Sequence, residues 1–159
     1  MYNWLVFLHI FFGFSLMLAH GVHAAAMLAF RNEKDPERAL TFFNIVPEIN
    51  MVRWLTVLMG VPGLIAAFIT PWWKQGWVWA SVVVFLIVSV VMYKYGAGYF
   101  ELIQRAAERL IESRKTNVNI ETALREFETA RTARHPIAVS IVGMVGLAII
   151  LWLMRFKPF

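Results

Sequence analysis

The sequence predicts an all-α fold: an integral membrane four-helix bundle with an amphipathic cytoplasmic helical hairpin between helices 3 and 4. The composition favours a membrane protein, because 60% of the 159 residues are hydrophobic and only 16% are charged. The apolar residues form blocks long enough to cross a bilayer, at about residues 4–30, 54–70, 77–98 and 136–155. Residues 99–115 and 120–134 repeat apolar side chains at helical spacing among charged ones, which predicts the hairpin. We therefore expect a single four-helix transmembrane domain over residues 1–159.

The first crossing is predicted from Trp4–Phe30, a run of 27 residues without Asp, Glu, Lys or Arg. At ~1.5 Å of rise per residue this run reaches about 40 Å, which exceeds the ~30 Å of bilayer hydrocarbon. No Lys or Arg precedes it, and its apolar core is longer than the ~7–15 residues of a signal peptide. We therefore expect a membrane helix here.

Three of the four histidines lie in this first helix, at His9, His20 and His23. At about 100° of turn per residue, His9 and His20 differ by about 20° and His23 lies about 60° from His20, so all three share one stripe. An imidazole in hydrocarbon is costly, so one interpretation is a functional site that faces the bundle interior. In the other, each ring is satisfied by a hydroxyl or carbonyl of a neighbouring helix, or lies at headgroup level.

A short helix is predicted over residues 36–44, because Asp35 can cap it, Pro36 suits its first position and Glu37 makes the first turn acidic. Its apolar residues are Ala39, Leu40, Phe42 and Phe43. These residues give the helix one apolar side, so we expect it to lie at the membrane surface.

The second crossing carries Pro62 near its middle, between Gly60 and Gly63. Proline removes a backbone hydrogen bond and kinks a helix, and glycine permits a neighbouring helix to approach closely. Such a kink either lines a functional site or is merely tolerated within the bundle.

The third crossing follows a turn that contains Trp72, Trp73 and Trp77, which is typical of an aromatic belt at a membrane edge. After it, the charges of the predicted hairpin suit a solvated face, with a partner-docking surface as the alternative. Asn119 can cap the second hairpin helix.

The fourth crossing contains Gly143 and Gly146, which leave room for close packing. It ends at Arg155 and Lys157, whose long side chains can reach the headgroup region.

Lys and Arg are distributed unevenly: four lie between the first and second crossings, eight between the third and fourth, and three on the opposite side. This bias predicts that both long loops are cytoplasmic and both termini outside. His20, His23 and His135 then lie in the cytoplasmic half and His9 in the outer half. A b-type haem between His135 and either His20 or His23 is therefore geometrically allowed. The alternative places His135 in the headgroup region beside Arg134.

Several stretches resemble small bacterial integral membrane proteins related to the copper-resistance D family, namely MYNWLVFLH, LAHGV, RNEKDPERAL and WWKQGWVWA. At greater distance, the layout is similar to the flavin-independent membrane protoporphyrinogen oxidase family. That resemblance matches Gly76-Trp77 and Lys157-Pro158-Phe159 to recurring family motifs, and it implies haem bound at His9 in the bacterial cytoplasmic (inner) membrane. It also puts Ser81 where the family has a functional lysine and Trp79 where a histidine is common. Ser81 cannot supply the amine, which counts against oxidase activity but leaves haem binding through His9.

Three functions remain in competition. The first is a haem-binding membrane protein with a redox or electron-transfer role, in which His9 and either His20 or His23 bind iron. The second is a non-catalytic accessory subunit of a larger respiratory or photosynthetic complex, which contacts lipid and other subunits or a second copy of itself. The third, copper or small-solute transport, is weaker because the methionines form no spaced ladder of ligands with the histidines.

Other classes have less support in the sequence. There is no cysteine, no nucleophile next to a base and no phosphate-binding loop, and the carboxylates lie only in the two long loops. A proton relay through the membrane would lack its usual acids, and we assign no catalytic residue, so enzymatic activity stays open. The net charge of +5 fits cationic loops beside anionic lipid better than nucleic-acid binding.

Overall fold

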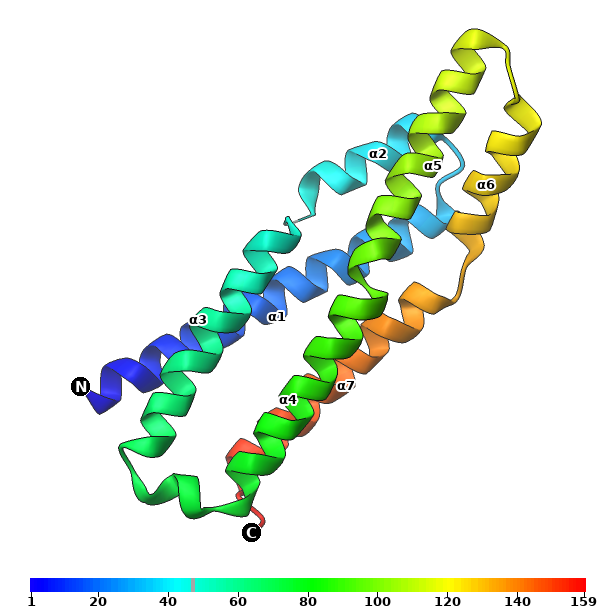
Figure 1. Ribbon diagram of the computed structural model, residues 1–159. Coiled ribbons are helices and arrows are strands. Elements are labelled where there is room, and N and C mark those ends of the chain that lie inside the picture. Colours follow the sequence, from blue (N-terminus) through cyan, green and yellow to red (C-terminus); the bar gives the residue numbers. More distant parts are fainter. Residues whose placement is uncertain (47) are drawn as a thin grey trace.

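The computed structural model describes residues 1–46 and 48–159, and every regular element within them is a helix (Figure 1). In chain order the elements are α1 (Tyr2–Asn32), α2 (Pro36–Ile45), α3 (Ile49–Phe68), the 3₁₀ turn η1 (Pro71–Lys74), α4 (Gly76–Tyr95), α5 (Ala97–Thr116), α6 (Ile120–Thr132) and α7 (His135–Phe156). Four stretches, which contain α1, α3, α4 and α7, are long and apolar enough to cross a membrane. The expectation of an all-α fold with four long apolar helices is therefore confirmed.

The helices do not stop where the apolar blocks stop, because backbone hydrogen bonding continues through charged residues. α3 begins at Ile49, five residues before the predicted block, so Arg53 belongs to the helix. It ends at Phe68, shortly before Pro71, which disfavours a helical conformation in the residue before it. α5 follows α4 with only Gly96 between them, so the third apolar helix leads almost directly into an amphipathic one.

The four apolar helices are arranged as two pairs: α1 packs along α3, and α4 packs along α7 (Figure 1). Contacts between α1 and α7 join the pairs. Glycine allows the second pair to approach closely, since a Cβ on Gly146 would lie 2.3 Å from Cγ2 of Val88 in α4. The backbones of α4 and α7 are therefore nearer to each other there than an alanine would permit.

A separate apolar core forms at one end of the molecule, where α2, α5 and α6 pack against the last turns of α1 (Figure 1). At its centre the fully buried rings of Phe30 and Phe127 meet edge to face, with centroids 5.7 Å apart. Its other buried members are Met27, Ala39, Ile103, Ala106, Ala107, Leu110, Ala123 and Ala130. We call this group the end core; it attaches α5 and α6 to α1.

The two predicted helix caps differ in outcome. Asp35 accepts a hydrogen bond from the backbone N–H of Glu37 at 3.1 Å, with Pro36 at the first turn, so this cap is confirmed. Asn119 does precede α6, but its side chain makes no capping hydrogen bond, so that expectation is wrong. Instead Asn117 and Asn119 both adopt φ = 56°, a left-handed conformation that asparagine tolerates better than most residues. Asn117 is the C-cap residue of α5 and Asn119 occupies the N-cap position of α6, so their backbones form the turn between the two helices.

Candidate histidine sites on the first helix

His9 joins α1 to α3 through a hydrogen bond to the backbone. Its Nδ1 lies 2.8 Å from the carbonyl oxygen of Met59. The ring also rests on Gly63, where a Cβ would lie 2.4 Å from Nδ1. Pro62 has no N–H to donate to the carbonyl of Leu58, so the gap that it leaves in the hydrogen bonding of α3 lies one residue before Met59. Gly63, which has no side chain, leaves the space that the His9 ring occupies.

His20 joins α1 to α7 in a similar way. Its Nε2 lies 3.2 Å from the carbonyl oxygen of Ser140. Gly143 faces the ring, and a Cβ at that position would lie 2.7 Å from both Cε1 and Nε2. One stripe of α1 therefore meets two different neighbours along its length, α3 near His9 and α7 near His20.

His23 bonds within its own helix. Its Nδ1 lies 2.8 Å from the carbonyl oxygen of Ala19, and its ring meets Phe100 of α5 edge to face, with centroids 5.0 Å apart. His135 lies elsewhere, at the start of α7; it is exposed, and its ring centroid is 5.6 Å from that of Tyr95. The structure thus gives each of the four predicted ligands a different environment.

The protonation of each α1 ring follows from its partner. A carbonyl oxygen only accepts hydrogen bonds, so the ring nitrogen that faces it must carry the proton. In the neutral form, His9 and His23 therefore keep a free lone pair on Nε2, whereas His20 keeps one on Nδ1. Histidines that bind metals commonly donate their other N–H to a backbone carbonyl in this manner.

The spacing of the histidines limits what one iron could bind. α1 is one continuous helix, so His9 and His20 are about 16 Å apart along its axis and His9 and His23 about 21 Å. Two residues so far apart cannot bind opposite sides of the same iron. A single haem would therefore not be shared by His9 and either His20 or His23.

Two observations bear on how well a metal or haem would fit. Among the described residues, no group of three or more His, Cys, Asp or Glu side chains is placed to hold a metal ion. A groove between α1 and α7 has a volume of about 240 Å³. Its lining on α1 begins at Ala24, the residue after His23. Since ligand sites usually enclose ~300–1,000 Å³, this groove does not enclose a porphyrin, although the imidazoles suit its iron.

The motifs of the family resemblance come together at the other end of the molecule. The backbone N–H of Trp77 donates to the main-chain oxygen of Phe159 at 3.2 Å, and the Phe159 ring lies against Gly76. The Lys157 ammonium lies 4.4 Å from the centroid of Trp72 and 5.5 Å from that of Trp77. The GW step and the KPF segment are thus one contact, which closes the start of α4 against the end of α7.

Ser81 and Trp79 hold the positions that the resemblance gives to a lysine and a histidine. Ser81 is buried, and its hydroxyl donates to the carbonyl oxygen of Trp77 at 2.8 Å. Trp79 is exposed, and its indole N–H donates to the carbonyl oxygen of Trp73 at 2.8 Å. Neither side chain provides an amine or imidazole there.

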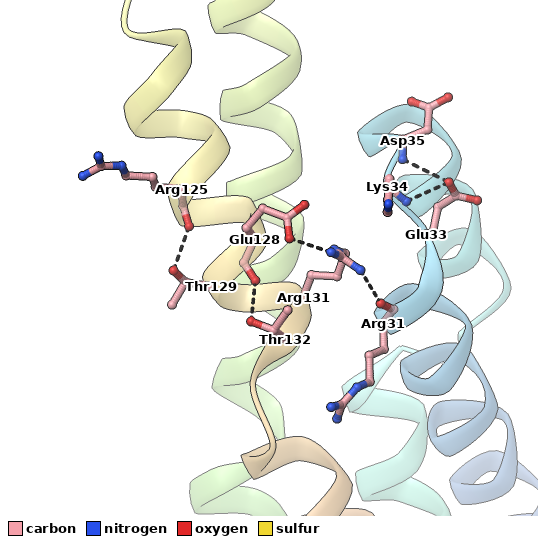
Figure 2. Close-up of polar contacts among 9 residues, drawn as sticks. All are labelled: Arg31, Glu33, Lys34, Asp35, Arg125, Glu128, Thr129, Arg131 and Thr132. Atoms are coloured by element: carbon pink, nitrogen blue, oxygen red, sulfur yellow. Dashed lines mark hydrogen bonds and ion pairs between the residues drawn. The ribbon is translucent and has the colours of Figure 1, made fainter.

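One polar contact had no clear signal in the sequence. Figure 2 shows Arg131 of α6 between Glu128 and the end of α1, with hydrogen bonds of 2.6 Å to the Glu128 carboxylate and 2.7 Å to the carbonyl oxygen of Arg31. The Arg131 side chain is only 14% exposed. A cation is favoured at a helix C-terminus because the last carbonyls lack partners and the helix dipole is negative there. The Glu128–Arg131 spacing was recognisable, but the contact to α1 joins residues a hundred positions apart.

No protein-family model, curated protein or solved structure matches this chain.

Proposed function

We propose that this chain is a multi-pass protein of the bacterial cytoplasmic membrane that binds a b-type haem through Nε2 of His9 or His23 and has an electron-transfer role. The four long apolar helices support membrane insertion, with the end core in the cytoplasm and both termini outside. When bound, the haem would supply an iron that takes up and releases one electron. The chain's own contribution is to hold and orient the imidazole.

The observation that carries this proposal is the orientation of the His9 and His23 rings. Each donates its Nδ1–H to a backbone carbonyl, which fixes the ring and leaves Nε2 as the acceptor. Nε2 is the ring atom farthest from the side-chain attachment, so it can approach an iron at the centre of a planar porphyrin. His20 is held the opposite way, with Nε2 on the Ser140 carbonyl, and is the least suited of the three.

His135 is the candidate for a second ligand to a haem held by His23. α1 and α7 run antiparallel (Figure 1). His20 contacts the Ser140 carbonyl of α7. Along the helix axes, His23 lies about 5 Å beyond His20 and His135 about 8 Å beyond Ser140, both toward the same end of the molecule. The two imidazoles are therefore at similar heights on neighbouring helices. A haem held by His9 would lack this partner.

Haem content tests the proposal directly. The chain, produced in cells supplied with haem precursors and purified in mild detergent, is expected to carry about one protohaem per chain in a pyridine haemochrome assay. A folded, helical preparation with no haem would contradict the proposal.

A second candidate function, an accessory subunit of a larger membrane complex, is favoured by a different observation. The four apolar helices expose many large apolar side chains, such as Phe14 in α1 and Trp152 in α7, each more than half exposed. Exposed apolar surface of this extent needs lipid or a partner to cover it. Co-purification of the haem-free chain with defined membrane subunits would support this function, and a monodisperse chain alone in mild detergent would count against it.

A further inference from the structure

A groove with a basic end lies on α4, and none of the four histidines lines it. Its volume is about 420 Å³, and its lining is apolar along most of its length. The lining residues are Leu86, Ser89, Val90, Tyr93 and Lys94. Because these positions recur at helical spacing, the groove follows one face of α4 for about two turns toward its C-terminal end.

Two cations lie at the C-terminal end of this groove: Lys94 lines it, and Arg53 contacts Tyr93, which also lines it. The guanidinium of Arg53, in the first turns of α3, lies 4.9 Å from the centroid of the Tyr93 ring. The ammonium of Lys94 lies 5.6 Å from the centroid of Tyr95. α3 begins and α4 ends at the same end of the bundle, so both charges lie at one level (Figure 1).

Neither cation is neutralised by a carboxylate of the described residues, since the salt bridges found there involve other side chains. Arg53 has only a long, 3.4 Å hydrogen bond to the side-chain oxygen of Asn50. Stacking on tyrosine holds a cation in place but leaves its charge free for an anion.

We propose that an anionic phospholipid occupies this groove, with its phosphate at Arg53 and Lys94 and one acyl chain along the Leu86–Val90 face of α4. An open apolar helix face that ends in two positive charges matches an amphiphile with a negative head. Basic sites between membrane helices on the cytoplasmic side bind anionic lipid headgroups for the same reason. The inference rests on the membrane insertion proposed above, but not on haem.

The test is native mass spectrometry of the chain released from nanodiscs that contain equal amounts of phosphatidylglycerol and phosphatidylcholine with the same acyl chains. The test variant is Arg53→Gln/Lys94→Gln. The control variant is Lys74→Gln/Arg155→Gln, which removes two cations that also stack on aromatic rings, Trp73 and Phe156, near the opposite end of the bundle. Circular dichroism confirms that both variants stay helical.

Wild type and the control variant are expected to retain one phosphatidylglycerol per chain, and the test variant about tenfold less. Equal retention in wild type and the test variant, or equal retention of the two lipids, would overturn the proposal. Membrane insertion is tested separately: a chain that alkaline carbonate releases from membranes without detergent contradicts insertion itself.

Discussion

The Nδ1 atom of His9 lies 2.4 Å from the position that a Cβ would occupy on Gly63, so the imidazole rests directly on the backbone of α3. The same nitrogen is 2.8 Å from the carbonyl oxygen of Met59, on the same helix. Contact and hydrogen bond together hold α1 against α3. The two residues are therefore expected to respond to mutation as a coupled pair.

Gly63→Ala is predicted to destabilise the chain by about 1–3 kcal/mol, because the new methyl group overlaps the His9 ring and both lie on packed helices. Thermal unfolding in detergent, followed by circular dichroism, measures the effect. Gly60→Ala is the matched control on the same helix, since its Cβ would lie a comfortable 3.9 Å from the Phe85 ring.

A double-mutant comparison of Gly63→Ala with and without the His9 ring tests whether the two residues are in contact. In a His9→Ala background the overlap is gone, so the cost of Gly63→Ala should fall by about half or more. If Gly63→Ala is as well tolerated as Gly60→Ala, or costs the same with and without the imidazole, the packing of His9 on α3 is incorrect.

Arg131→Met is predicted to loosen α6 from the end of α1. The substitution removes hydrogen bonds to the Arg31 carbonyl and the Glu128 carboxylate (Figure 2), and bonds of this charged kind are worth about 1.5–3 kcal/mol. Hydrogen exchange of the α6 amides should become faster. Arg125→Met is the control: its ion pair with Glu121 is more than three-quarters exposed on both sides, so its loss should cost less than about 0.5 kcal/mol. Similar exchange rates in the two variants would show that the contact to α1 contributes nothing.

The membrane orientation is predicted from the charge distribution and is open to a clean labelling test, because the chain has no cysteine. Lys115→Cys, exposed near the tip of α5, should resist a membrane-impermeant maleimide in intact cells and react after the cells are opened. Gln75→Cys, exposed between η1 and α4, should react in intact cells. The reverse pattern would place the end core outside and invert the proposed topology.

The helices themselves were largely predictable because their signals are local. An uncharged run such as Trp4–Phe30 can hardly form anything but a long apolar helix, and Asp35 before Pro36 marks a helix start. Helix ends were less predictable: α3 begins five residues early because Arg53 is compatible with a helix. The turn at Asn119 was also misjudged, since asparagine suits both a cap and a left-handed residue.

The partners of the histidines were not predictable from periodicity. Helical spacing places His9 and His20 on one stripe of α1, but it cannot show that α3 lies beside the first and α7 beside the second. It also cannot tell which ring nitrogen faces a carbonyl, and that decides which nitrogen is free. The contact of Arg131 with Arg31 could not be predicted for the same reason, because it depends on how distant segments pack.

The most direct test of the central claim is the absorption spectrum of the detergent-purified chain, oxidised and dithionite-reduced, for wild type and the variants His9→Ala, His20→Ala, His23→Ala and His9→Ala/His23→Ala. If His9 or His23 binds haem, wild type shows a Soret band that persists in His20→Ala, is lost in one of the other two single variants, and is absent from the double variant. If His23 is the ligand, His135→Ala should also change the spectrum from low-spin to high-spin. A wild-type chain without a Soret band, or a double variant that keeps it, would contradict haem binding by the first helix.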